Sequence, residues 1–295
     1  MTLDEAESTE SVLPMLAQDY RNSGHRIVFP AYAQRKLDGV RCLVTRFDKN
    51  VLTFMSRSGK DYGPVMCKHE RLYNDLLKLL KPGDVLDGEL YVHGWTLQKI
   101  TSATKKLKPN TLELEFWAFD FPSVKEPWRK RIHALADLFE KVDEESPIKY
   151  VNSVQLNKAD EVKTYHDQFV KEGFEGIIIR NLDGIYRFGV RSADLQKYKE
   201  FLEDEFEIVD SFEEIQNKNK KEYTCIVFVC QTKDEMRFNC RPRGSLKQRE
   251  EWWNEREAFV GKKLTVRYFA LTDDTEGKGK KVPQFPVGVC VRDYE

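Results

Sequence analysis

The order of strand-like and helix-like segments is the feature that most narrows the folds open to this chain. Apolar residues recur at helical spacing in segments 66–80, 128–142, 159–171 and 246–260. Short runs of branched and aromatic residues predict strands at 40–46, 51–55, 85–92, 112–119, 176–180, 206–211, 223–229, 236–239, 263–269 and 285–292. Because the two kinds of segment mix without strict alternation, we expect an α+β fold with largely antiparallel sheets.

Composition predicts a division of the chain. With 295 residues the chain is long enough for two hydrophobic cores. After residue 202 come short predicted strands, one helix and lysine-rich turns, which favour a small β-barrel such as an OB-fold. We therefore predict two domains, 1–201 and 202–295, with the acidic stretch 200–207 as the linker.

The net charge of -1 gives no overall signature of nucleic-acid binding, so affinity for a polyanion must come from local patches. Lysine and arginine cluster at 99–108, 218–221, 241–243 and 278–281. Each cluster taken alone is more simply a solvated loop. Their recurrence in one chain favours a surface that binds a polyanion.

The six cysteines form no C-x-x-C pair and no cluster with histidine, so neither a zinc site nor a disulfide framework is expected. The first ten residues are acidic and lack the apolar core of a signal peptide. No uninterrupted apolar stretch approaches the length of a membrane span. We expect a soluble intracellular protein, cytoplasmic or nucleoid-associated, that does not engage a membrane.

The run 36–41 (K-L-D-G-V-R) is the strongest candidate for a reactive site. A lysine attacks poorly at neutral pH because its amine is protonated, and nearby positive charge or desolvation counters this. Arg41 supplies such a charge, and Gly39 permits a tight turn that would present Lys36 beside a phosphate. The alternative for this run is a charged turn at the surface.

Several carboxylates lie in or beside apolar runs that are typical of buried strands. Asp87 and Glu89 fall within 85–92, and Glu175 opens the run that ends at Arg180. A buried carboxylate is costly unless it is paired or binds a metal ion or a hydroxyl group. These residues are therefore either structural ion-pair partners or ligands of a metal ion or a sugar.

Other residues suit contact with a nucleotide. Lys197 and Lys199 lie two apart and so share one face of a strand, where an anion such as a triphosphate would relieve their repulsion. Arg57, among serines after a short strand, suits a phosphate or a ribose; its alternative is an exposed turn. Phe119, in an aromatic segment, is placed to stack on a base, although core packing is its default interpretation.

The order of these features resembles the nucleotidyltransferase superfamily of ATP-dependent DNA ligases, RNA ligases and mRNA capping enzymes. The resemblance covers nearly the whole chain and is strongest from Lys36 to Lys199. It looks closest to the minimal viral and phage-type ATP-dependent DNA ligases, which consist of a nucleotidyltransferase (adenylation) domain and an OB domain. The ligase interpretation is supported by Glu175-Gly176, where capping enzymes usually carry Asp-Gly, by Phe119-Asp120 and by the runs 188–192 and 285–293.

The resemblance implies a role for each matching position. Lys36 would attack the α-phosphate of ATP, releasing pyrophosphate and leaving a covalent lysine–AMP. Lys197 and Lys199 would hold the α-phosphate, and Arg292 would orient the pyrophosphate when the OB domain closes. Arg41 would bind AMP or the phosphate of the nick. The AMP would pass to the 5′-phosphate of a nick in duplex DNA, and the 3′-hydroxyl would displace it.

Contacts to the nucleoside and to metal are implied in the same way. Gln34 would contact the exocyclic amine of adenine, and Phe119 would stack on its ring. Arg57 and Glu89 would bind the ribose. Glu175 and Glu89 would bind the divalent metal, most simply Mg²⁺. The implied partner is nicked duplex DNA, and a monomer is the simplest state for a clamp around it.

Other activities stay open at this level. An RNA ligase or RNA-end-repair enzyme would share the lysine chemistry, and the sugar of the substrate cannot be read from these residues. A GTP-dependent mRNA capping enzyme would be labelled by GTP in place of ATP. A catalytically silent nucleic-acid-binding module would leave five residues without a function: Lys36, Glu89, Glu175, Lys197 and Lys199.

Overall fold

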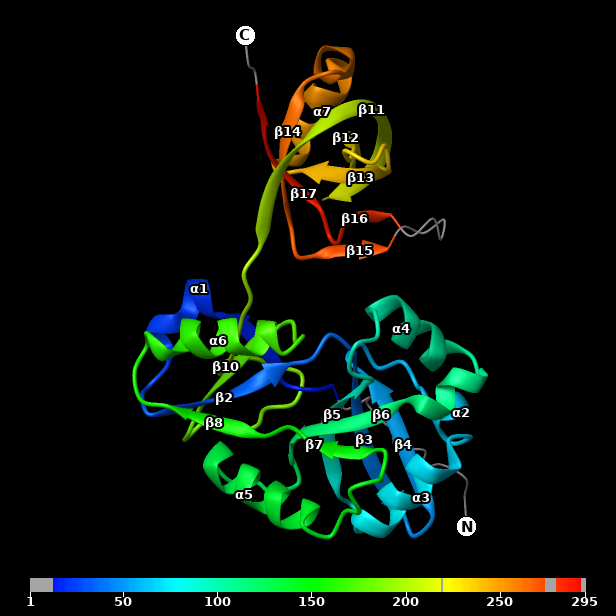
Figure 1. Ribbon diagram of the computed structural model, residues 1–295, viewed down its shortest axis with the longest axis vertical. Helices are drawn as coiled ribbons and strands as arrows, with labels where there is room; N and C mark the ends of the chain where they lie inside the picture. The colour runs from blue at the N-terminus through cyan, green and yellow to red at the C-terminus, as the bar shows by residue number, and fades with distance from the viewer. Residues whose placement is uncertain (1–12, 219, 274–279, 293–295) are drawn as a thin grey trace. The chain divides into compact units, whose positions relative to one another are not determined.

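The structure is a computed structural model that describes residues 13–218, 220–273 and 280–292 (Figure 1). The chain divides into two compact units, Met1–Lys199 and Glu200–Glu295. The predicted boundary at 201/202 lies next to this division. Within the described ranges, no helix has the length and apolarity that crossing a lipid bilayer would need.

The first unit contains two five-stranded sheets. One has the order β1-β10-β9-β2-β8, with β1 (Leu16–Asp19), β10 (Arg191–Tyr198), β9 (Gly176–Asn181), β2 (Ala31–Lys36) and β8 (Ser153–Leu156). Helix α6 (Glu161–Lys171) packs on this sheet, because its Phe169 shares a hydrophobic cluster with Ile177 and Ile179. The short helices α1 (Tyr20–Ser23) and η1 (Gly24–Arg26) connect β1 to β2.

The other sheet has the order β4-β3-β5-β6-β7, with β4 (Val51–Ser56), β3 (Val40–Asp48), β5 (Val85–Tyr91), β6 (Glu115–Asp120) and β7 (Ile148–Tyr150). Its helices are α2 (Gly63–Met66), α3 (Glu70–Leu79), α4 (Leu97–Lys105), η2 (Pro109–Glu113) and α5 (Trp128–Phe139). Leu76 of α3, Phe116 of β6 and Leu135 of α5 are fully buried in one shared core. Most neighbouring strands are antiparallel as predicted, but β1–β10 and β6–β7 are parallel, so both sheets are mixed.

Side chains on β2 alternate between two environments, and this alternation positions the candidate site. Ala31 and Ala33 belong to the cluster beneath α6, whereas Tyr32 packs against the core of the other sheet. Gln34 and Lys36 follow Tyr32 at the two-residue spacing that places strand side chains on one face. Both therefore point from the first sheet toward the second.

The second unit is built around strands in the order β11-β12-β13-β17-β14, which form a closed barrel. These strands are β11 (Leu202–Lys218), β12 (Lys221–Gln231), β13 (Arg237–Pro242), β14 (Lys263–Tyr268) and β17 (Val287–Arg292). Ile208, Phe228 and Val266 are fully buried within it. Outside the barrel lie α7 (Leu246–Asn254), η3 (Arg256–Phe259) and the hairpin of β15 (Leu271–Asp273) with β16 (Lys281–Pro283).

Candidate functional site

Lys36 is the last residue of β2, a strand that lies between β9 and β8. Its main-chain carbonyl accepts a hydrogen bond from the Glu175 N–H at 2.9 Å. Its Nζ forms an ion pair with the Glu175 carboxylate. The Lys36 side chain is 20% exposed, so the amine is both held in place and open to a ligand.

Glu175 lies between two lysines. One carboxylate oxygen contacts Lys36, and the other accepts a hydrogen bond from Lys199 Nζ at 2.5 Å. Burial alone would raise the pKa of Glu175, but the charges of Lys36 and Lys199 outweigh burial and lower it. Glu175 is therefore ionised at neutral pH and orients both ammonium groups.

Lys197 adds a further cation on the same side of the sheet. Its neighbour Tyr198 packs into the cluster beneath α6, so Lys197 points the other way, toward the second sheet. Burial lowers the pKa of Lys197, and the charges of Lys36 and Lys199 lower it further. Lys36, Glu175, Lys197 and Lys199, here called the lysine cluster, hold more positive than negative charge, which suits an anionic ligand.

The lysine cluster depends on a close approach at Gly176. A Cβ built on Gly176 would lie 2.6 Å from the Tyr198 carbonyl oxygen, and its φ is +154°. A side chain there would push the end of β10 away, and Lys197 and Lys199 would move with it. The glycine after Glu175 is therefore required by packing.

Glu89 reaches the same region from the second sheet. Its Oε1 accepts a hydrogen bond from the Gly39 N–H at 3.0 Å, which holds the turn that follows Lys36. Burial raises the pKa of Glu89 to about 7, and the charge of Glu175 adds to this rise. Lys36 and Arg41 oppose it. Glu89 therefore titrates near neutral pH.

Arg41 is paired within the protein. Its Nε and Nη2 donate to the two carboxylate oxygens of Asp87 at 2.9 and 2.5 Å, and the Tyr186 hydroxyl also donates to Asp87, at 2.6 Å. Burial alone would lower the pKa of Arg41, but Asp87 raises it above its ordinary value. Of the two interpretations open for Asp87, the structure shows the ion pair. The predicted phosphate contact of Arg41 stays a prediction.

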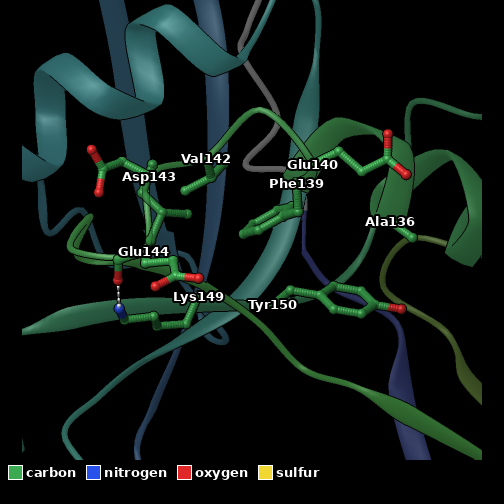
Figure 2. A pocket seen from close by; sticks show the side chains of 9 residues that line it. Ala136, Phe139, Glu140, Val142, Asp143, Glu144, Lys149 and Tyr150 are labelled. Carbon is green, nitrogen blue, oxygen red and sulfur yellow. Dashed lines mark hydrogen bonds between the residues drawn. The ribbon is translucent and has the colours of Figure 1, made fainter.

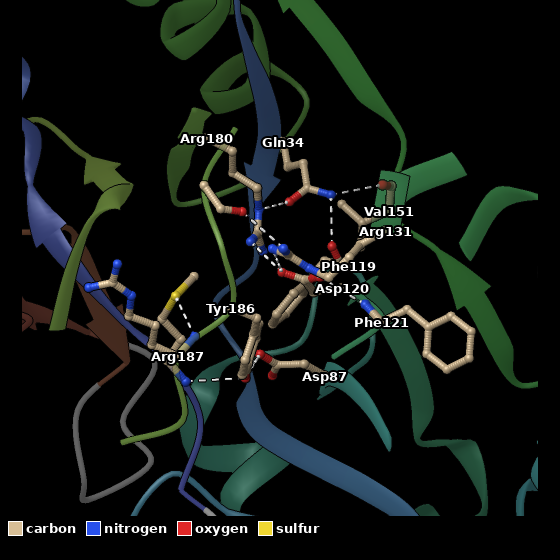
Figure 3. A network of polar contacts seen from close by, with 12 residues as sticks. Gln34, Asp87, Phe119, Asp120, Phe121, Arg131, Val151, Arg180, Tyr186 and Arg187 are labelled. Carbon is tan, nitrogen blue, oxygen red and sulfur yellow. Dashed lines mark hydrogen bonds and ion pairs between the residues drawn. The ribbon is translucent and has the colours of Figure 1, made fainter. Parts of the chain in front are cut away.

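A separate network of polar side chains, which is buried, joins the two sheets (Figure 3). This arginine network consists of Gln34 on β2, Asp120 on β6, Arg131 on α5 and Arg180 on β9. Arg180 Nη1 and Arg131 Nε each donate to the Asp120 carboxylate at 2.7 Å. Burial alone would raise the pKa of Asp120, but the two arginines lower it. Arg180 Nε donates to Gln34 Oε1, also at 2.7 Å.

The Gln34 amide is bound within the protein. Its Nε2 donates to the main-chain carbonyls of Phe119 at 3.2 Å and Val151 at 3.4 Å, and the residue is 1% exposed. An adenine amine donates and would need the Gln34 oxygen, which accepts from Arg180 and keeps a second lone pair. The predicted adenine contact of Gln34 therefore stays a prediction. Phe119 itself is partly exposed.

The other predicted residues lie as follows. Arg57 is exposed just after β4, and its charge contributes to the lowered pKa of Lys197, after burial and the other lysines. Arg292 lies on β17 of the second unit, where its Nε donates to Thr265 Oγ1 at 2.9 Å and pairs with Glu205 at 3.3 Å. The predicted role of Arg292 in closure stays a prediction.

Glu175 and Glu89 are the predicted metal ligands. The two carboxylates interact electrostatically, because the charge of Glu175 raises the pKa of Glu89. Carboxylate oxygens suit Mg²⁺, which keeps several waters and is often shared with substrate phosphates. Because Glu175 already pairs with Lys36 and Lys199, a metal ion here fits best when phosphate oxygens complete its shell.

Sequence reasoning passed over Arg131 and Tyr186, and it noticed Asp120 and Arg180 only as parts of motifs. A signal for Arg180 was present, because an arginine at the end of an isoleucine run needs a buried partner. Arg131 directly precedes the buried Ile132 on α5 and is itself fully buried. No local pattern marks Tyr186.

Cavities also occur away from this site. One of about 330 Å³ lies between the end of α5 and β7, where Phe139, Ile148 and Tyr150 are among its lining residues (Figure 2). Another of about 710 Å³ is lined by residues that include Arg46, Lys78 and Asp137. Neither cavity is lined by a residue that the sequence predicted for the site.

The first unit matches a known protein family. Residues 14–199 match the model of the ATP dependent DNA ligase domain. A DNA ligase of African swine fever virus (isolate Tick/South Africa/Pretoriuskop Pr4/1996) is 30% identical over 290 residues, which cover 92% of this chain and 67% of the viral protein. The DNA ligase of Enterobacteria phage T4 is 26% identical over 246 residues, covering 66% of this chain and 50% of the phage protein.

Solved structures share the fold. A structure described as Pmar-Lig_Pre has a TM-score of 0.78 at 21% identity and covers 97% of this chain and 69% of that chain. One of the Lig E DNA ligases, described as binding DNA with a minimal scaffold, has a TM-score of 0.68 at 21% identity and covers 95% of this chain and 99% of that chain. At such identities the likeness concerns the fold alone.

Proposed function

Since the chain belongs to the family of ATP-dependent DNA ligases, we propose that it seals nicks in duplex DNA through a covalent AMP on Lys36. Ligases of this family use ATP and a divalent metal ion, most simply Mg²⁺. The substrate is a 5′-phosphate beside a 3′-hydroxyl. The proposal concerns which residues of this chain carry each step.

The lysine cluster is the observation that carries the proposal. The Lys36 side chain is partly exposed, and its amine contacts Glu175, a carboxylate placed to take up the proton that the amine must lose. Attack on the α-phosphate of ATP spreads negative charge over the phosphate oxygens. Lys197 and Lys199 would stabilise that charge, because phosphoryl transfer depends mostly on positioning and electrostatics.

The proposed reaction has three steps. The Lys36 nitrogen bonds to the α-phosphorus of ATP while the bond to pyrophosphate breaks. The AMP then passes from Lys36 to the 5′-phosphate of the nick. The 3′-hydroxyl finally attacks that phosphate, and AMP leaves. Each new phosphodiester bond consumes one ATP.

We assign the nucleoside contacts to the second sheet and its neighbours. Phe119 would stack on adenine, with Glu89 and Arg57 on the ribose. Support for Glu89 comes from its hydrogen bond to Gly39, which places its carboxylate next to the turn that follows Lys36. Arg41 would bind AMP or the phosphate of the nick while Asp87 shares its charge.

We further assign 1–201 to an adenylation domain and 202–295 to an OB-fold domain. The closed order β11-β12-β13-β17-β14 supports the second assignment. Arg292 would orient the pyrophosphate when this domain closes, and Glu175 with Glu89 would hold Mg²⁺ together with phosphate oxygens. A monomer is the simplest state for a clamp on DNA.

The test is sealing of a 5′-labelled nicked duplex with ATP and Mg²⁺, comparing an all-DNA nick with one that has RNA on the 3′-hydroxyl side. We expect the DNA nick to be sealed by the wild type and not by Lys36→Ala. Covalent labelling with ATP should exceed labelling with GTP. Failure to seal either nick, or labelling by GTP alone, would refute the DNA ligase assignment.

A further inference from the structure

Phe174, the residue before Glu175, leads to an inference about how the carboxylate of the lysine cluster is held, and this inference rests on the proposed function. We propose that Phe174 is a positioning residue whose ring, packed against both sheets, fixes Glu175 beside Lys36. On this proposal, Phe174 touches neither ATP nor DNA and acts on the reaction through the carboxylate that follows it.

The main chain at Phe174 is fixed by the way helix α6 ends. The Phe174 N–H donates to the Phe169 carbonyl at 3.0 Å. The Gly173 N–H donates to the Val170 carbonyl, also at 3.0 Å, and Gly173 has a φ of +91°. These two bonds and the left-handed glycine form a Schellman motif, a common end of a helix. The chain therefore leaves α6 in one defined direction.

The Phe174 ring packs against aromatic residues of the second sheet. Its centroid lies 4.8 Å from that of His93, 6.4 Å from that of Tyr91 and 6.5 Å from that of Trp117. Tyr91 on β5 and Trp117 on β6 are themselves in edge contact, with centroids 5.5 Å apart. Rings attract one another at such distances and tilts, so these neighbours hold the Phe174 ring in one place.

The same ring contacts the first sheet. The Arg35 guanidinium lies 5.5 Å from the centroid of Phe174 and 4.6 Å from that of Phe169, and its Nε donates to Glu172 at 2.7 Å. Among the residues that the structure describes, Phe174 is the one partly buried hydrophobic residue that packs against the clusters of both sheets. It therefore connects the sheets at the end of β2, where Lys36 follows Arg35.

Glu175 is anchored on both sides along the chain. Phe174 holds it on one side, and on the other β9 begins at Gly176, where no side chain fits. The Glu175 N–H donates to the Lys36 carbonyl at 2.9 Å, and its carboxylate contacts Lys36 and Lys199. A smaller side chain in place of Phe174 would release one anchor. The carboxylate would then shift and orient the Lys36 amine less well.

A ring that only fills space predicts a different result from a ring that positions Glu175. A space-filling ring contributes stability, and its loss has no particular effect on the reaction. A positioning ring contributes to the maximal rate, and its effect disappears once the Glu175 carboxylate is gone. A matched control is Phe139 on α5, which is also partly buried, packs against the second-sheet cluster and lies 5.8 Å from the Tyr150 ring.

The experiment measures single-turnover labelling by ATP and thermal unfolding for Phe174→Leu and Phe139→Leu. We expect Phe174→Leu to lower the maximal rate of labelling about tenfold, with the KM for ATP within about twofold of the wild type, because orientation is lost and binding is kept. Phe139→Leu should lower the unfolding temperature by a similar amount and label at the rate of the wild type.

Three results would overturn the proposal. One is a labelling rate in Phe174→Leu within about twofold of the wild type, or an equal loss of rate in Phe139→Leu. Another is a KM raised about tenfold at an unchanged maximal rate, because the ring would then act on ATP binding. The last is an additive loss in the double variant. In the Glu175→Gln background, Phe174→Leu should change the residual rate by no more than about twofold, since both act through one carboxylate.

A wild type that ATP does not label would refute the proposed function, and a second measurement then decides on Phe174. Acetic anhydride modifies lysine amines, and mass spectrometry compares its rate at Lys36 with its rate at the exposed Lys158. Displacement of Glu175 frees the Lys36 amine. Phe174→Leu should therefore raise this ratio at least about twofold, as expected when an ion pair of a partly exposed amine opens. An unchanged ratio would overturn the proposal.

Thermal unfolding also shows whether each variant folds. If Phe174→Leu does not fold, Phe174→Met replaces it, because the flexible methionine side chain fills irregular gaps in a core. The same two ratios, of labelling rates and of modification rates, then decide. Phe139→Met becomes the matched control.

Discussion

The lysine cluster lies on the first sheet, the arginine network joins that sheet to the second, and the two handle charge in opposite ways. In the lysine cluster, the side chains of Lys36 and Lys199 are 20% and 18% exposed, and the one carboxylate, Glu175, serves both. In the arginine network, Asp120 and both arginines are no more than 2% exposed. Asp120 accepts hydrogen bonds from Arg131 on α5 and from Arg180 on β9.

This difference teaches where each kind of charge is useful. A buried ion must have its hydrogen bonds satisfied, so the interior favours the planar, multidentate arginine. A binding site instead keeps excess charge at an accessible position, where an incoming anion completes it. Lysine suits that place because its amine can also lose its proton and attack.

The largest expected effect tests the reactive side of this comparison. Lys36→Ala should reduce covalent AMP labelling by at least about 10⁴-fold, roughly 5 kcal/mol, because the nucleophile is gone. Lys158→Ala, which removes an exposed lysine paired with Asp160, should label as the wild type does. Labelling that persists in Lys36→Ala, measured with radiolabelled ATP, would move the nucleophile elsewhere.

The next effect tests the contribution of the arginine network to stability. Asp120→Asn should lower the free energy of unfolding by about 3–5 kcal/mol, because two buried guanidinium groups lose their counter-charge. Glu175→Gln should lower the free energy of unfolding by only about 1 kcal/mol or less, because its lysine partners reach water. The same variant should abolish most labelling, because Glu175 orients Lys36. Urea unfolding followed by fluorescence measures the stability of both variants, and equal losses of stability would show that Glu175 is as structural as Asp120.

A smaller effect concerns Lys197, the lysine of the cluster for which the described residues provide no ion pair. Lys197→Ala should slow labelling by about 100-fold, or roughly 2.7 kcal/mol, because one charge facing the phosphate is lost. Stability should stay unchanged or rise slightly, because the charges of Lys36 and Lys199 repel Lys197. A large loss of stability without loss of labelling would place Lys197 among the structural residues.

The smallest expected effect is a pH dependence. Because the pKa of Glu89 is about 7 in the folded protein and 4.5 as an ordinary value, the folded state holds a proton that the unfolded chain has lost between these values. Stability should therefore fall as pH rises through this window, by about 1.4 kcal/mol for each pH unit. Glu89→Gln should remove this slope in thermal unfolding at pH 5 to 8.

Glu175 responds to pH in the opposite direction. Its lowered pKa stabilises the fold above its ordinary value of 4.5, and this stabilisation is lost as pH falls. The two carboxylates thus act in opposite directions and in separate pH ranges. A Glu89→Gln protein that keeps the slope of the wild type above pH 5 would contradict the assignment.

Much of the first unit could be predicted from local pattern. The predicted strands 40–46 and 176–180 correspond to β3 and β9, and the predicted helices 128–142 and 159–171 to α5 and α6. The strand that carries Lys36 was not predicted. Its sequence, A-Y-A-Q-R-K, has no β-branched residue, and it is extended because it pairs with β8 and β9.

The pairing of charges could not be predicted, because it depends on distant parts of the chain. Motif order marked Glu175 and Lys36 as site residues, yet they lie 139 residues apart and only the sheet brings them together. The sequence around Asp87 suited a metal ligand and an ion-pair partner equally. In the structure Asp87 pairs with Arg41, which lies 46 residues away in the sequence. Local sequence marks residues that need a partner without naming the partner.

The register of β2 has a consequence for how faulty copies of this protein would behave. Because side chains alternate along the strand, a slip of one residue against β9 would turn Lys36 and Gln34 into the hydrophobic cluster beneath α6 and expose Ala33. Such a chain would lose its nucleophile and its core together. Misfolded copies should therefore be unstable enough for proteolysis to clear them, leaving few folded but inactive molecules to occupy DNA ends.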